Sequence, residues 1–176
     1  RARFLDEVER DRFLEEVNNL DDVIMKSFFL ILIYTGQRKT NVLEMSWNDI
    51  SLNSKKWIIP VTKTAENFTV PLSDKAIKVL EELKEIRVND FVFYGAGKTG
   101  HLVEPKKAFK RILENAGIEN FRLHDLRRTF ASMLSEQGIN EFVIKDLLGH
   151  KSLDMTAIYA RSSAKSLHNA VNSLQG

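Results

Sequence analysis

Three segments in the second half of the sequence carry side chains that could act together on an anionic group. His124 and Arg127 are three residues apart, so on a helix they would share a face and could contact the same anion. His150 follows Gly149, and a glycine that ends a helix leaves the next residue at an exposed corner. Tyr159 follows nine residues later. A tyrosine has a pKa of about 10, so its attack on a phosphate requires help in removing the proton.

Two segments upstream extend this set in a fixed order. Arg38 ends the run Thr-Gly-Gln-Arg, and Lys63 begins the run Lys-Thr-Ala-Glu-Asn-Phe-Thr-Val-Pro-Leu. Each of the five segments is weak alone, but together they resemble the signature of the tyrosine recombinases, the phage integrase family. That signature has a TGxR motif, a lysine on a β-hairpin, an HxxR helix, an LGH turn and a downstream tyrosine. One position departs from it, because the family usually has Glu or Asp where this sequence has Asn41.

The resemblance implies a set of catalytic residues, which in chain order are Arg38, Lys63, His124, Arg127, His150 and Tyr159. Tyr159 would attack the DNA backbone and form a 3′-phosphotyrosyl bond. The two arginines and His150 would hold the phosphate, since a planar guanidinium can contact two oxygens at once. His124 would help to manage the proton of the nucleophile, and Lys63 would protonate the leaving 5′ oxygen. The reaction would need no metal, cofactor or ATP.

The resemblance therefore predicts a site-specific DNA recombinase or integrase that acts on double-stranded DNA. Two alternatives remain open: a DNA-relaxing enzyme like the type IB topoisomerases, and a non-catalytic helical DNA-binding protein. We also expect self-association on DNA, with a C-terminal helix over 164–174 as the candidate contact; the alternative is that this helix packs on its own domain. Its apolar residues Leu167, Ala170, Val171 and Leu174 are spaced to form one stripe. The family resemblance implies a cytoplasmic location in a bacterial or phage-infected cell.

The composition restricts the chemistry without naming it. The chain has 176 residues, enough for one domain with a substantial core, and we expect a single catalytic domain over 1–176. Family members commonly carry an additional N-terminal DNA-binding domain. The sequence has no cysteine, which excludes disulfides, thiolate metal sites and a cysteine nucleophile. The net charge of +2 is only a weak indication of an anionic partner.

The hydrophobic pattern predicts an α+β fold that is mostly helical, with a small antiparallel sheet. Apolar periodicity, capping residues and glycines predict helices over about 4–20, 23–34, 39–46, 73–86, 105–116, 123–137, 141–148, 154–161 and 164–174. The β-rich runs within 56–72 predict a hairpin with Lys63 near its turn. Residues 90–94 are predicted as a third short strand, and the three glycines of 95–100 as a loop.

Overall fold

The computed structural model describes residues 3–60, 67–103, 105–149 and 164–175. Within them the chain forms the following helices: α1 (Glu7–Asn18), α2 (Val23–Thr35), α3 (Lys39–Leu43), α4 (Asp74–Glu85), α5 (Lys106–Asn115), α6 (Asp125–Glu136), α7 (Glu141–Leu147) and α8 (Ala164–Asn172). Short 3₁₀ turns follow α3 at Trp47–Asp49 (η1) and α8 at Ser173–Gln175 (η2). The strands are β1 (Ile50–Ser51), β2 (Lys56–Ile59) and β3 (Phe68–Pro71). The predicted mostly helical fold is confirmed.

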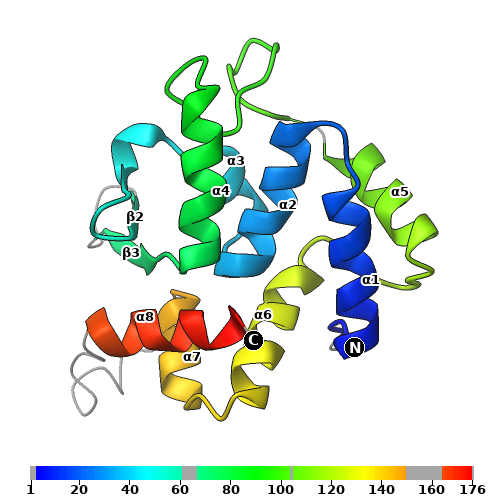
Figure 1. Cartoon of the computed structure of the whole chain (residues 1–176), viewed down its shortest axis with the longest axis vertical. Coiled ribbons are helices and arrows are strands. Elements are labelled where there is room, and N and C mark those ends of the chain that lie inside the picture. The colour runs from blue at the N-terminus through cyan, green and yellow to red at the C-terminus, as the bar shows by residue number, and fades with distance from the viewer. Residues whose placement is uncertain (1–2, 61–66, 104, 150–163, 176) are drawn as a thin grey trace.

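Helix α2 is the centre of the molecule. It is buried along almost its whole length, as its nearly continuous apolar sequence predicts. Figure 1 shows α4 on one side of α2 and α1 on the other, with α5 outside α1 and with α6, α7 and α8 gathered at one end. These last three helices share a second, smaller apolar cluster that contains Phe130, Leu148 and Val171. The predicted catalytic residues Arg38, His124 and Arg127 lie on the segments where this cluster meets the end of α2.

The helices begin where their capping residues predict. Asp6 forms a capping box with Glu9 at the start of α1, Ser73 caps α4, and Asn140 caps α7. Each of these side chains accepts a hydrogen bond from a backbone N–H that has no partner within its helix. Helices α4 and α7 therefore begin within one residue of their predicted starts, whereas α1 begins three residues later than the predicted start at residue 4.

The sheet has three antiparallel strands in the order β1-β2-β3, and the hairpin of β2 and β3 pairs Trp57 with Val70. The hairpin was predicted, but the third strand was placed wrongly at 90–94. That segment makes only isolated bridges, such as Ser46 with Phe91, and the strand that pairs with the hairpin is instead β1, at one edge of the sheet. The apolar run around Phe93 is instead explained by burial in the main core. Among the described residues, no helix is long and apolar enough to cross a membrane.

Candidate active site

The end of α2 fixes one wall of the candidate site. Gly36 ends the helix in the left-handed conformation, with a φ of 62°. A Cβ atom at this position would lie only 2.4 Å from Cδ1 of Phe130 in α6 and 3.0 Å from Cδ2 of Leu148. Only glycine suits both the backbone angle and this close approach. The motif that ends in Arg38 is therefore pressed against α6 and the end of α7.

Arg127 joins these three elements through its guanidinium group. Its side chain extends from the first turn of α6 and is buried, with 6% of its surface exposed. Nη1 donates to the carbonyl oxygen of Gly36 over 2.9 Å, and Nη2 donates to that of Leu148 over 2.5 Å. One planar group thus connects the C-terminal ends of α2 and α7. Each of those ends lies two residues before another predicted catalytic residue.

The environment of Arg127 is strongly cationic. Burial lowers its pKa, and the positive charge of Arg38 lowers it further, to about 10. The group nevertheless stays protonated at neutral pH. Within the described ranges, no carboxylate forms an ion pair with either arginine. Two positive charges held near each other without a negative partner form a place where an anion would be stabilised.

Arg38 differs from Arg127 in its surroundings. It lies at the N-terminal boundary of α3, makes no capping hydrogen bond there and is exposed to solvent. Asn41, in the position where the family usually has an acid, lies one turn further along α3. Its side chain makes no hydrogen bond to Arg38 in the described part of the chain. The guanidinium of Arg38 is therefore available to an incoming ligand.

His124 immediately precedes α6 and is not part of it. Its backbone angles are already helical, and its carbonyl oxygen accepts a hydrogen bond from the backbone N–H of Arg127 over 3.2 Å. The side chain of His124 is exposed, whereas that of Arg127 is buried. The predicted spacing of three residues is thus realised across the start of the helix.

The hairpin approaches the same corner of the molecule. Gly149 adopts a φ of 67°, and a Cβ atom there would lie 3.1 Å from the ring of Phe68, the first residue of β3. The strand that follows Lys63 in the sequence therefore lies against the turn that precedes His150. Lys63, His150 and Tyr159 themselves lie outside the described residues, as does the predicted helix over 154–161.

Gln37 is a member of this corner that the sequence analysis did not identify. Its side chain is 3% exposed, and Nε2 donates to the carbonyl oxygens of Leu147, over 2.8 Å, and Thr35, over 3.2 Å. It provides a second polar connection between the ends of α2 and α7. The sequence did contain one indication of this role, because Gln37 is a polar residue between a helix-ending glycine and a candidate catalytic arginine. The partner Leu147 is 110 residues away, however, and only the fold identifies it.

The described residues contain no group of three or more His, Cys, Asp or Glu side chains arranged to hold a metal ion. The two arginines of this corner, Arg38 and Arg127, can bind an anion as fixed cationic donors. A phosphodiester in which charge develops on the nonbridging oxygens is an anion of this kind.

Comparison with known proteins agrees with this chemistry. Residues 3–166 match the phage integrase family. The integrase of Salmonella phage P22 is 31% identical, with 91% of this chain and 44% of that protein aligned. A tyrosine recombinase of Thermosipho africanus is 27% identical, with 97% of this chain and 61% of that protein aligned. The chain thus spans roughly half the length of these relatives.

Solved structures show the same fold. The integrase from mycobacterium phage Brujita superimposes with a TM-score of 0.80 at 19% identity, covering 98% of this chain and 57% of that one. The XerA recombinase superimposes with a TM-score of 0.71 at 23% identity, covering 99% of this chain and 64% of that one. Neither comparison favours the topoisomerase alternative. The sequence match over residues 3–166, together with this shared fold, shows that the chain belongs to the phage integrase family.

Proposed function

We propose that this chain is the catalytic domain of a site-specific DNA recombinase that cuts and rejoins DNA strands through Tyr159. The observation that carries the proposal is the pair of arginines at the end of α2 and the start of α6. Arg127 donates to the carbonyl oxygen of Gly36, two residues before Arg38, and no described carboxylate neutralises either arginine. A scissile phosphate would supply the missing negative charge.

In the proposed reaction one phosphodiester bond is exchanged for a phosphotyrosyl bond and is later restored. The hydroxyl of Tyr159 attacks the phosphorus, the bond to the 5′ oxygen breaks, and a 3′-phosphotyrosyl bond forms. A 5′-hydroxyl from another strand then reverses the attack and restores a phosphodiester. Arg38, Arg127 and His150 would oppose the charge on the nonbridging oxygens in both steps. Loss of one such donor typically costs a factor of about 10² to 10³ in rate.

Two further residues would move protons. We assign to His124 a role in managing the proton of the Tyr159 hydroxyl, and its exposed position beside the buried Arg127 is consistent with access to a ligand. We assign to Lys63 the protonation of the leaving 5′ oxygen. The contact between Phe68 and Gly149 supports this assignment, because it brings one strand of the hairpin against the same corner.

Double-stranded DNA is the proposed partner, and the surface of α5 supports this. Four basic residues of this helix are exposed: Lys106, Lys107, Lys110 and Arg111. Such a cluster suits phosphate contacts along a duplex. Among the structural neighbours, XerH is bound to its difH substrate and a lambda integrase dimer to a core site. A DNA substrate would place the reaction in the cytoplasm of a bacterial or phage-infected cell.

Self-association through residues 164–174 remains part of the proposal. In the single chain, α8 packs on its own domain, because Ala170 and Val171 are buried against the cluster of α6 and α7. Exchange of this helix between protomers would replace the same apolar contacts with equivalent ones on a neighbour. The position of Tyr159 would then depend on assembly.

The experiment is a covalent-capture assay on nicked duplexes that carry recombination sites from the DNA flanking the gene. The expected result is a protein–DNA adduct with the unchanged chain and none with Tyr159→Phe, which removes one hydroxyl at nearly constant volume. DNA affinity should change by less than a few fold. An adduct that persists in Tyr159→Phe would contradict the assignment. Transfer of the captured strand to a separate 5′-hydroxyl strand would distinguish recombination from relaxation.

A further inference from the structure

The first turn of α6 carries Arg127 and follows His124, yet it lacks apolar support on one side. An open cavity of about 820 Å³ lies there, with a lining that is largely polar and includes Glu119, Arg122 and Asp125. Close packing normally holds buried elements to within a fraction of an ångström. Leu126 packs this turn into the main core, and on the side of the cavity hydrogen bonds add to the support of the start of α6.

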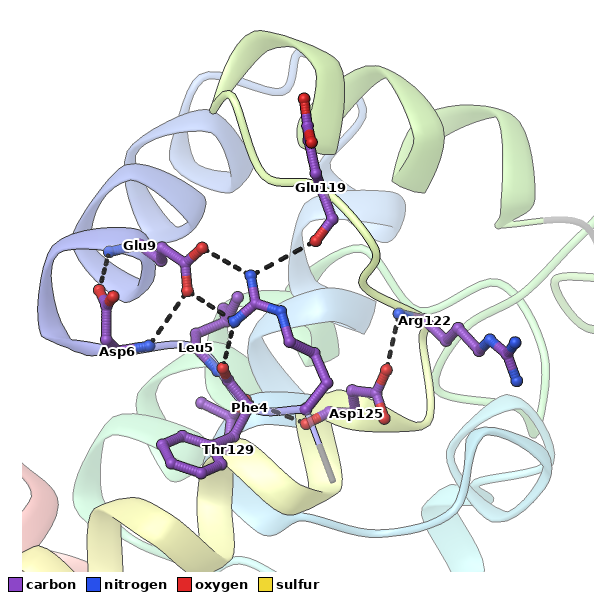
Figure 2. Close-up of polar contacts among 9 residues, drawn as sticks. Phe4, Leu5, Asp6, Glu9, Glu119, Arg122, Asp125 and Thr129 are labelled. Atoms are coloured by element: carbon purple, nitrogen blue, oxygen red, sulfur yellow. Dashed lines mark hydrogen bonds and ion pairs between the residues drawn. The ribbon is translucent and has the colours of Figure 1, made fainter. Parts of the chain in front are cut away.

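Thr129 provides one of these connections. Its side chain is fully buried, and its hydroxyl donates to the carbonyl oxygen of Asp125 over 3.0 Å. The Oγ1 atom of Thr129 itself accepts a hydrogen bond from the backbone N–H of Leu5, also over 3.0 Å. Leu5 is fully buried as well and lies 124 residues away in the sequence. One hydroxyl therefore fastens the N-terminal segment Arg3–Asp6 to the turn that carries Arg127 (Figure 2).

Asp125 holds the same turn from its other side. Its carboxylate is 3% exposed and accepts a hydrogen bond from the backbone N–H of Arg122 over 2.9 Å. It also pairs with Arg128 over 2.6 Å, which neutralises that cation. Of the basic residues in this first turn, Arg127 alone thus points to the candidate site without a described counter-charge.

The N-terminal segment is itself anchored. Arg3 donates to both carboxylate oxygens of Glu9, over 2.7 and 2.6 Å, and to the carbonyl oxygen of Glu119 over 3.4 Å. Its guanidinium lies 5.6 Å from the centre of the Phe121 ring. Figure 2 shows the hydrogen bonds at the carboxylate of Glu9 and at the backbone carbonyl of Glu119. Residues 3–5 therefore bridge the start of α1, the loop before α6 and α6 itself.

We propose that Thr129 is a positioning residue for Arg127. By tying the N-terminal segment to the first turn of α6, its hydroxyl sets the point from which the Arg127 guanidinium reaches Gly36 and Leu148. A small displacement of this turn would misalign the guanidinium with a bound phosphate, and errors of about 1 Å at such a group can cost a factor of about 10² in rate. The role of Arg127 in this inference rests on the proposed function.

The test compares Thr129→Val with Thr129→Ser. Valine keeps the shape but loses the donor and the acceptor, whereas serine keeps the hydroxyl. Ser73→Ala is the matched control, because it removes another buried hydroxyl that bonds to one backbone N–H, that of Ala76 at the start of α4. Three quantities are measured for each protein: the melting temperature, the single-turnover cleavage rate against DNA affinity, and the ¹⁵N–¹H signal of Arg127 Nε–H, assigned by its loss in Arg127→Lys.

The expected result is a shifted Arg127 signal and a cleavage rate about tenfold lower in Thr129→Val, with DNA affinity within twofold. Thr129→Ser should restore both, and Ser73→Ala should lower only the melting temperature. The proposal is overturned if Thr129→Val leaves the Arg127 signal in place, or if Ser73→Ala shifts it equally. The signal does not require cleavage, so absence of any DNA adduct would refute the proposed function alone.

Should Thr129→Val fail to fold, Arg3→Leu tests the same connection from the surface. It removes the contacts with Glu9 and Glu119 while Thr129 stays in place. A shift of the Arg127 signal in the same direction, smaller than in a folded Thr129 variant, supports the proposal. An unchanged signal in a folded Arg3→Leu protein overturns it.

Discussion

The two arginines of the candidate site belong to regions that are built differently. Arg127 is buried in the first turn of α6 and bonds two backbone carbonyls, those of Gly36 and Leu148. Arg38 is exposed at the boundary of α3 and has no described hydrogen-bond or ion-pair partner for its side chain. One arginine is part of the scaffold, and the other is free to respond to a ligand.

Because of this difference, the effects of the two arginines on stability and on the reaction can be measured separately, even if both contact the same phosphate. Arg127 should contribute to folding and to the reaction, because its donors satisfy buried carbonyls. Arg38 should contribute only to the reaction, and its charge should slightly oppose folding by repelling Arg127.

Arg127→Ala is expected to have the largest effect. It should lower the cleavage rate by a factor of about 10² or more. It should also lower the free energy of unfolding by about 1–3 kcal/mol, because the carbonyls of Gly36 and Leu148 lose their donor. Single-turnover cleavage at saturating DNA and chemical denaturation measure the two effects. Arg127→Lys, which keeps the charge but cannot span both carbonyls, should recover little of either. An unchanged stability would contradict a scaffold role.

Arg38→Ala should lower the cleavage rate by a similar factor of about 10² while leaving stability unchanged or slightly raised. The removal relieves repulsion, so the pKa of Arg127 should rise towards its ordinary value. The same two assays apply, with Lys39→Ala on the neighbouring, half-buried residue as a control for charge. A clear loss of stability in Arg38→Ala would remove the distinction between the two regions.

Lys63→Ala sharpens the comparison by separating proton transfer from phosphate binding. A 5′-bridging phosphorothiolate leaves without a proton, so on that substrate Lys63→Ala should cleave at close to the unchanged rate. Arg127→Ala should not recover on it. Normal cleavage of the ordinary substrate by Lys63→Ala would show that another lysine or a water donates the proton.

Deletion of residues 164–176 tests the smaller apolar cluster and should weaken the fold without unfolding the domain. The domain should stay folded, because the main core is untouched. Its melting temperature should fall by roughly 5–10 °C, because burial of Ala170 and Val171 is lost. If the helix also docks on a neighbour, binding to paired sites should become less cooperative in gel-shift assays. A large loss of melting temperature with unchanged cooperativity would show packing within one chain only.

Local rules in the sequence determined the helices and the hairpin. Asp6, Ser73 and Asn140 act through neighbours within three residues, and Gly36 acts through its own backbone angle. Interactions between residues so close in the sequence depend little on the rest of the fold. The apolar run of α2 likewise predicted burial on all sides. The strand at 90–94 was wrong because an apolar run bounded by turns can be core without pairing in a sheet.

The order of motifs also determined the family, and with it the expectation that distant residues meet. How they meet depends on the tertiary structure, which buries Arg127 and leaves Arg38 exposed. It also lets Gln37 donate a hydrogen bond to the carbonyl of Leu147, and Thr129 accept one from the N–H of Leu5. These contacts join residues about a hundred positions apart, and side-chain spacing along the chain carries no information about them. They depend on how α2, α6 and α7 pack, which is fixed by the shapes of many buried side chains at once.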